Sequence, residues 1–404
     1  MQSNIKFREF TLLMALLMSI VSFSIDAVLP ALGEIGQALS VKNDNQAQWV
    51  IIAIFAGMTI GQLIAGPLSD AIGRKRILFA GIAIYFVGSL LCYLTQQFEF
   101  FLLGRFIQGV GVAGPYVASI STVRDKYSGD QMARIMSLIM MVFMVAPAVA
   151  PSIGQLIIHF SGWREIFLMY VIYAFVIGAW VAFRLEETLL PENRIAMRKS
   201  AFQEGFFEVV RNKTTMSYLI CAGFCFGGLI GYLGSSQQIF MQQYGLSGEA
   251  FSGYFALLAG VMGVASFTNS KIVMRFGMRT ICIYGLLGLS ILSFLFFALQ
   301  IVGMQIPFWL FMLYAVFLFA MFGTLFGNLN AIAMEPMGHV AGMASAIIGA
   351  ASSIISLILA AIIGQMYDGT LRPMTGGFMI LFALAFLIAY WENKQRNSPM
   401  SAQV

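Results

Sequence analysis

Apolar and polar positions along the chain form long blocks. Apolar stretches of about 20 residues, the length that crosses about 30 Å of hydrocarbon, are separated by short polar segments. Each stretch predicts one membrane-spanning helix, and twelve can be counted. They cover residues 10–33, 47–68, 76–95, 99–123, 133–158, 164–184, 215–240, 250–271, 279–301, 306–333, 341–366 and 374–391.

The composition agrees with this pattern. Of the 404 residues, 59% are hydrophobic and 10% are charged, and the mean hydropathy is +0.85. Soluble domains carry about 25% charged residues. The sequence therefore predicts an all-α integral membrane protein. The first apolar stretch is too long for a cleaved signal peptide, so we expect it to be retained.

The longest polar segment divides the twelve stretches into six and six. We predict an N-terminal six-helix bundle at 1–185, a linker at 186–213 and a C-terminal six-helix bundle at 214–404. Within the linker, residues 201–210 (AFQEGFFEVV) have apolar positions at helical spacing. This spacing indicates a short amphipathic helix on the cytoplasmic membrane surface.

The net charge of +5 lies mostly in loops on one side of the predicted spans. Clusters such as Arg74 to Arg76 fall on that side, whereas Lys42, Arg164 and Arg372 fall on the other. By the positive-inside rule, both termini are expected to be cytoplasmic. Because the bases sit in short membrane loops, the positive charge does not indicate a nucleic-acid partner.

A charged loop after the second stretch has a weaker copy half a chain later. The first copy reads SDAIGRKR (69–76) and the second VMRFGMRT (273–280), with Gly277 in the place of Gly73. Met274 stands where the first copy has Asp70, so we expect an acid-base contact in one half only. A half-chain repeat predicts two pseudo-symmetric bundles with a binding site between them.

Three motifs resemble those of the major facilitator superfamily. They are the loop GPLSDAIGRKR, then LGRFIQGVGVAG (103–114) in the fourth stretch, and APAVAPSIGQ (146–155), which is similar to the proline-glycine signature of the antiporters. SIDAVLPAL (24–32), VRDKY (123–127) and GWREIF (162–167) resemble drug:proton antiporters of the bicyclomycin and chloramphenicol resistance type. Asp26 is followed here by Ala27, where that group usually has an aromatic residue or methionine.

The resemblance implies the major facilitator fold, with twelve transmembrane helices in two six-helix bundles. It also implies a monomer in a bacterial inner membrane. Transport would be driven by a proton gradient, without a bound cofactor. The partners expected are protons, a small-molecule substrate and the lipid bilayer.

Two charges lie inside predicted spans. A carboxylate such as Asp26 is costly in an apolar run unless it faces a cavity or takes up a proton, so we expect it to carry the coupled proton. The alternative is a simple marker of the membrane interface. Arg105 cannot discharge itself and needs acceptors. The resemblance implies a role in proton exchange for Arg105, and the alternative is that it reaches out to the interface.

The fifth stretch carries Pro147, Pro151 and Gly154, which interrupt helical regularity. We expect these residues to bend the helix and to pack it on its counterpart in the other half, closing one side of the membrane to protons. Alternatively, they are merely tolerated, because proline and glycine are common in membrane helices.

For the first charged loop we predict a conformational latch. Asp70 is expected to accept hydrogen bonds from a helix N-terminus or from an arginine such as Arg134. The alternative is a solvated topology marker. The residues assigned to this latch are Gly66, Asp70, Gly73, Arg74, Arg76 and Arg134.

Candidate substrate contacts are aromatic, soft or amide side chains within spans, although each alone is more often a packing residue. They are Tyr116, Phe143, Met144, Phe226, Tyr232, Gln237, Tyr254, Asn328 and Asn330. The sequence shows no nucleophile arrangement, metal-ligand spacing or phosphate loop, so neither an enzyme nor an ATP-driven pump is indicated.

The function that fits these features is proton-coupled antiport, exporting small amphipathic compounds by alternating access. A dedicated siderophore or metabolite exporter would fit equally well. A uniporter, a proton symporter or a non-transporting sensor would use the same fold. The proline-glycine stretch argues against the uniporter and the symporter, and no signalling domain supports the sensor.

Overall fold

The computed structural model describes residues 5–194 and 199–396, and within these ranges the chain is helical, without strands. Twelve helical segments are long and apolar enough to cross a membrane, which confirms the predicted number of spans. The chain divides into two compact units, described separately below. The predicted linker residues 195–198 lie outside the described residues, as do 1–4 and 397–404.

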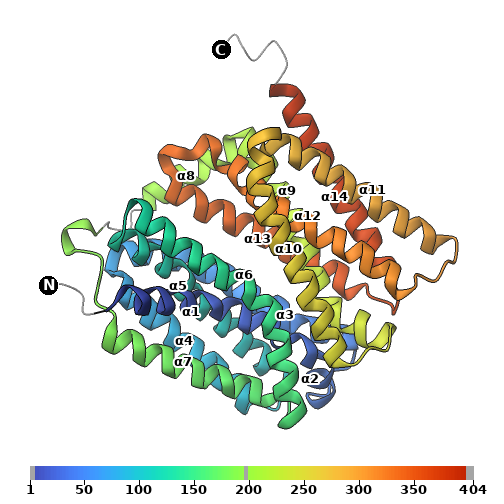
Figure 1. Cartoon of the computed structure of the whole chain (residues 1–404), viewed down its shortest axis with the longest axis horizontal. Helices are drawn as coiled ribbons and strands as arrows, with labels where there is room; N and C mark the ends of the chain where they lie inside the picture. The colour runs from blue at the N-terminus through green and yellow to red at the C-terminus, as the bar shows by residue number, and fades with distance from the viewer. Residues whose placement is uncertain (1–4, 195–198, 397–404) are drawn as a thin grey trace. The chain divides into compact units, whose positions relative to one another are not determined.

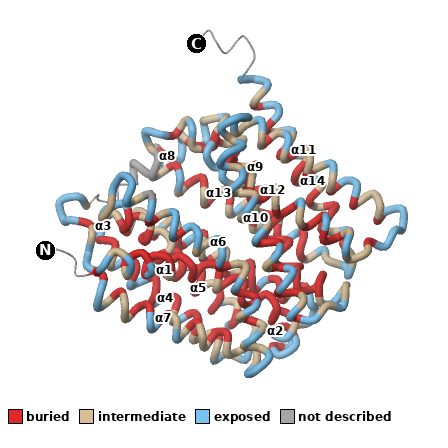
Figure 2. Tube along the Cα trace, in the orientation of Figure 1, coloured by how far each residue is buried: buried red, intermediate tan, exposed pale blue. Residues whose placement is uncertain are grey.

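Unit 1 comprises Met1–Arg198 together with Ser247–Ala256 (Figure 1). Within it α5 packs on α3 and α4, α4 also packs on α7, and α1 packs on α6. Figure 2 shows α1 as the most continuously buried of these helices. The helices are α1 (Phe7–Asp26), α2 (Leu32–Ala38), α3 (Trp49–Ile72), α4 (Arg74–Leu94), α5 (Phe98–Lys126), α6 (Gly129–Phe160) and α7 (Arg164–Arg184).

Unit 2 comprises Lys199–Leu246 and Leu257–Val404. In this unit α9 packs on α12, α13 and α14, and α11 packs on α12 and α14. The predicted amphipathic helix is confirmed as a helix, within α8, and it contacts α13. The helices are α8 (Lys199–Arg211), α9 (Lys213–Gln237), α10 (Gly248–Phe276), of which residues 248–256 group with unit 1, α11 (Met278–Ile301), α12 (Phe308–Met334), α13 (Ala341–Gln365) and α14 (Arg372–Arg396).

Two predicted spans are not continuous α-helices. The span predicted at 10–33 ends as α-helix at Asp26, and a 3-10 turn, Leu29–Ala31, then leads into α2. Pro30 lies in that turn, and a proline cannot donate the hydrogen bond that would extend α1. The span predicted at 215–240 ends as α-helix at Gln237 and continues as a π-helix, Gln238–Gln243.

Glycines bring α3 and α5 together. A Cβ placed on Gly57 would lie 2.0 Å from the carbonyl oxygen of Phe106, and one on Gly61 would lie 2.8 Å from that of Val110. Side chains at these positions would push the backbones apart, so glycine permits the close packing that membrane helices use. Gly66 is different, because the nearest atom to its Cβ would be a Val117 methyl at 3.9 Å. The close approach of α3 and α5 therefore ends before Gly66.

Candidate functional site

Asp26 is the last residue of α1, and its side chain is buried, with 6% of the residue exposed. Among the described residues, its carboxylate takes part in no hydrogen bond or ion pair. Helix α1 ends at Asp26, and the 3-10 turn that contains Pro30 follows while the chain is still buried. A carboxylate at a buried helix end therefore stands without a partner.

Arg105 of α5 is fully buried and satisfied by oxygen acceptors from three helices. Its Nη2 donates to the carbonyl oxygen of Ser24 at 2.9 Å, its Nε to that of Val50 at 3.2 Å, and its Nη1 to Oε1 of Gln108 at 2.8 Å. The guanidinium thus joins the ends of α1 and α3 to α5. This arrangement contradicts the alternative in which Arg105 reaches out to the membrane interface.

A chain of hydrogen bonds extends from Arg105 across the core of unit 1. The amide nitrogen of Gln108 donates to the Ser89 hydroxyl at 2.7 Å, and the Ser24 and Tyr85 hydroxyls are 2.8 Å apart. All four side chains are buried, and buried polar groups are costly unless they are paired. Sequence analysis missed these residues, although Gln108 lies three positions after Arg105 and so shares its helix face.

The proline-glycine segment contacts the turn beside Asp26. A Cβ on Gly154 would lie 1.9 Å from the carbonyl oxygen of Ala27, so α6 meets the end of α1 backbone to backbone. Helix α6 is continuous through Pro147 and Pro151. The close neighbour of Gly154 is thus Ala27, the residue that follows α1 in the same unit, and the expected packing of the fifth span on its counterpart in the other half stays a prediction.

Ser252 makes a further contact with this segment of α6. It lies in the part of α10 that groups with unit 1, and its hydroxyl lies 3.2 Å from the carbonyl oxygen of Pro151. Pro151 lacks the N–H group that would donate to the carbonyl of Pro147, whereas Gln155 can still donate to the carbonyl of Pro151. A carbonyl oxygen has two lone pairs, so that of Pro151 can accept from Ser252 as well.

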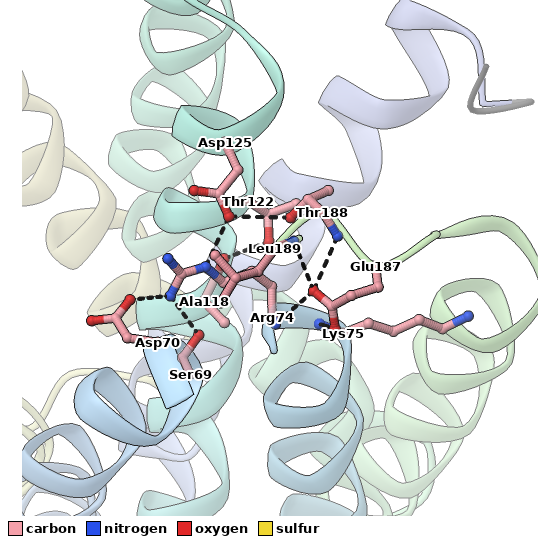
Figure 3. A network of polar contacts seen from close by, with 10 residues as sticks. All are labelled: Ser69, Asp70, Arg74, Lys75, Ala118, Thr122, Asp125, Glu187, Thr188 and Leu189. Atoms are coloured by element: carbon pink, nitrogen blue, oxygen red, sulfur yellow. Dashed lines mark hydrogen bonds and ion pairs between the residues drawn. The ribbon is translucent and has the colours of Figure 1, made fainter. Parts of the chain in front are cut away.

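The first charged loop is a network centred on Arg74 (Figure 3). Its Nε donates to Oδ2 of Asp125 at 2.9 Å, and its Nη1 contacts Oδ1 of Asp70 and the Ser69 hydroxyl. The partner of Asp70 is therefore an arginine, one of the two kinds of partner expected, but it is Arg74 and not the suggested Arg134. Asp125 comes from the last turn of α5, so the guanidinium links the α3–α4 loop to a third helix.

Glu187 completes this network from a distant part of the sequence. Its carboxylate accepts the backbone N–H groups of Arg74 at 2.8 Å and Lys75 at 3.2 Å, which are the first residues of α4 (Figure 3). The same carboxylate accepts the N–H groups of Thr188 and Leu189, both at 3.0 Å. A negative group at a helix N-terminus is favourable. The sequence carried no signal for this contact, because 113 residues separate Glu187 from Arg74.

The other residues assigned to the latch lie in different surroundings. Gly73 has φ +114°, and its Cβ would lie 2.3 Å from Oε2 of Glu187, so glycine is needed there for conformation and for space. Arg76 is exposed and has no ion pair among the described residues. Arg134 is exposed, with Cζ 5.5 Å from the centroid of the Phe7 ring.

The second charged loop also contains an ionic cluster, although Asp70 has no counterpart there. Nη2 of Arg279 donates to Oε2 of Glu335 at 2.7 Å, and its Nη1 lies 3.7 Å from Oε2 of Glu392. The Thr214 hydroxyl donates to the other oxygen of Glu392 at 2.7 Å. The acid of the repeat is thus present in one half only, as expected, while Arg279 has acidic partners that come from other segments. The acids come from α14 and from the turn after α12.

The candidate substrate residues are divided between the two units. In unit 1, the rings of Tyr116 and Phe143 lie 6.3 Å apart, whereas Met144 and Tyr254 are exposed. In unit 2, Tyr232 is fully buried against Phe319 and its hydroxyl has no partner among the described residues.

The remaining candidates belong to unit 2. Phe226 packs edge-on to Phe326, and Gln237 is buried in the last turn of α9. The amide of Asn328 exchanges hydrogen bonds with that of Asn269, and Asn330 donates to a carbonyl of its own helix. Two hollows are described in this unit, one at the Arg279 cluster and one between α11 and α14, and none of the nine candidates lines either.

A family model described as Major Facilitator Superfamily matches residues 12–361. The chain belongs to this superfamily. It is therefore a multi-pass membrane transporter and not an enzyme. It is 30% identical over 380 residues to a bicyclomycin resistance protein homolog of Haemophilus influenzae, covering 93% of this chain and 95% of that one.

The chain is also similar to other proteins at lower identity. The chain is 28% identical over 343 residues to the multidrug resistance protein MdtL of Salmonella paratyphi B, covering 84% of this chain and 85% of the relative. Its fold is similar to the xylose transporter XylE from E. coli in a partially occluded inward-open conformation. That similarity has a TM-score of 0.75 at 14% identity, and covers 96% of this chain and 97% of the other.

Proposed function

We propose that this transporter exports small amphipathic compounds, including drugs, in exchange for protons. The named functions of its relatives, bicyclomycin and multidrug resistance, support export of drugs. The observation that carries proton coupling is the buried carboxylate of Asp26, which has no partner among the described residues. An ionised carboxylate in such a place is costly, and binding a proton removes that cost.

Arg105 is proposed to hold the end of α1 while Asp26 gains and loses its proton. Its hydrogen bond to the Ser24 carbonyl acts on the helix turn that carries Asp26, and this positive charge lies at the negative end of α1. The contact between Gly154 and Ala27 brings α6 against the same turn. A change in the protonation of Asp26 can therefore act on both α5 and α6.

In the proposed cycle, Asp26 takes up a proton from outside and releases it to the cytoplasm as the two units alternate in access. Substrate and proton compete for the same carboxylate region, so the exchange needs no coupling at long range. One proton crossing about 100 mV supplies roughly 2.3 kcal/mol. We propose that this gradient drives export by a monomer in the bacterial inner membrane, with both termini cytoplasmic and no bound cofactor.

The test uses purified protein in proteoliposomes with an imposed pH gradient. Bicyclomycin is the first probe, and a panel of fluorescent lipophilic compounds follows. Asp26→Asn should abolish transport driven by the pH gradient, because the neutral amide cannot exchange a proton. The matched control is Glu34→Gln, which removes an exposed carboxylate eight residues later and should leave transport unchanged. Full gradient-driven transport by Asp26→Asn would refute the proposed role of Asp26.

A further inference from the structure

Helix α7 contributes two tyrosine hydroxyls that donate to carbonyl groups of α1. The Tyr170 hydroxyl donates to the carbonyl oxygen of Phe23 at 2.7 Å. The Tyr173 hydroxyl donates to that of Leu16 at 2.9 Å. Leu16 lies in the middle of α1, whereas Phe23 lies three residues before Asp26, the last residue of the helix. The two tyrosines therefore make the same kind of bond at different distances from the proposed proton site.

The Phe23 carbonyl lies at the level of Asp26 in the last turn of α1. It also accepts the N–H group of Ala27, the residue that follows the helix, at 3.2 Å. The last carbonyl groups of an α-helix form the negative end of its dipole, which disfavours a carboxylate nearby. Two donors counteract this effect, because Tyr170 donates to the Phe23 carbonyl and Arg105 donates to the next one.

Tyr170 is held firmly in the core of unit 1. The residue is 1% exposed, and its ring centroid lies 5.6 Å from that of Phe167 and 6.2 Å from that of Tyr85. The segment of α6 beside Ala27, residues 150–155, carries no charged side chain. The charged and titratable groups within electrostatic reach of the Tyr170 hydroxyl are Asp26 from α1, Tyr85 and Cys92 from α4, and Arg105 from α5.

We propose that Tyr170 is a positioning residue for Asp26. Its hydroxyl fixes the last turn of α1 and places the positive end of a dipole there, so that Asp26 can ionise when it releases its proton. Tyr170 acts through the Phe23 carbonyl and does not receive the proton. The bond of Tyr173 lies seven residues earlier, about 10 Å farther along the helix axis, so Tyr173 has no such role. This role of Tyr170 rests on the proposed function, in which Asp26 carries the coupled proton.

The test compares Tyr170→Phe with the matched control Tyr173→Phe. Each change removes one hydroxyl of α7 and keeps the ring. Infrared spectra of the purified full-length protein, recorded over a range of pH, contain the C=O stretch of protonated carboxyl groups. The part of this signal that is missing in Asp26→Asn reports the protonation of Asp26.

The midpoint of the Asp26 signal should move to higher pH in Tyr170→Phe, by about 0.5 pH unit, because the ionised carboxylate loses a nearby dipole. The pH profile of exchange in proteoliposomes should move in the same direction. Tyr173→Phe should leave both midpoints unchanged. Thermal unfolding is measured in parallel, because the loss of a buried hydrogen bond alone lowers the stability of both variants without moving either midpoint.

An unmoved midpoint in Tyr170→Phe would overturn the positioning role, and so would an equal shift in both tyrosine variants. Failure of the proposed function gives a different result. In that case Asp26→Asn keeps gradient-driven exchange, or its infrared signal is the same as that of the native protein. If only the positioning role fails, Asp26→Asn is inactive and the two tyrosine variants behave alike.

Discussion

The two charged loops, one in each unit, both pair an arginine with two acidic side chains, but the acids come from different positions. In unit 1, the side chain of Arg74 is 7% exposed and contacts two aspartates, one of them from its own loop. In unit 2, Arg279 is 16% exposed, and both of its glutamates come from other segments. An arginine in such a loop therefore keeps acidic partners even when the acid of the repeat is lost.

The loops also differ at the glycine before the following helix. Both glycines have positive φ, +114° at Gly73 and +78° at Gly277. Only Gly73 is crowded, by the carboxylate of Glu187, whereas nothing lies within 4 Å of a Cβ on Gly277. The first loop is thus attached to the segment that follows α7, and among the described residues Gly277 has no comparable contact. This comparison favours the first loop as the conformational latch.

The largest effect is expected from removing the arginine of each loop. Arg74→Gln leaves Asp125 and the cluster without their cation, and should destabilise unit 1 by about 3 kcal/mol, the low end for a buried pair. Arg279→Gln should cost only about 1 kcal/mol, because its near partner Glu335 is 45% exposed and screened by solvent, and its buried partner Glu392 is 3.7 Å away. Thermal unfolding in detergent measures the loss of stability in both variants, and exchange in proteoliposomes measures their transport. Equal losses for the two variants would contradict the distinction between the loops.

A smaller difference is expected from the two glycines. Gly73→Ala introduces backbone strain and a collision with Glu187, and should cost about 2 kcal/mol, whereas Gly277→Ala introduces strain alone, at about 1 kcal/mol. Thermal unfolding in detergent measures the loss of stability in each variant. As a control, Gly73→Ala should cost less when it is introduced into Glu187→Ala than when it is introduced into the native protein. An equal cost in both backgrounds would show that Glu187 does not restrict this position.

The smallest effect on stability is expected at Asp70. Its side chain is 44% exposed, so Asp70→Asn should cost less than about 1 kcal/mol and leave the twelve-span topology intact. As part of the latch, the change should nevertheless lower the exchange rate. Asp130→Asn, at an exposed carboxylate in the first turn of α6, is the matched control. An unchanged exchange rate for Asp70→Asn would leave this loop as a topology marker.

Several features of the site could be anticipated from single residues. Asp26 and Arg105 stood out because a charge inside an apolar stretch needs an explanation. Their surroundings could not be anticipated in the same way. The hydrogen-bonded chain through Gln108, Ser89 and Tyr85 depends on which faces of α4 and α5 meet.

The partners of two other residues were also decided by packing. An arginine such as Arg134 was one expected partner of Asp70, and the structure has Arg74, one helix turn away. Gly154 was expected to lie at a helix contact, and its close neighbour is Ala27, just after the end of α1. In both cases the sequence indicated which residue forms a contact, and helix packing determined its partner.

The sequence by itself determined the number of membrane spans, the all-helical fold and the superfamily. It could do so because hydrocarbon requires long apolar helices whatever their neighbours are. Only the tertiary structure decided which oxygens satisfy Arg105, which acids hold Arg279, and that Glu187 caps α4. Those contacts join residues as much as 113 positions apart, and their geometry depends on how helices pack rather than on local sequence.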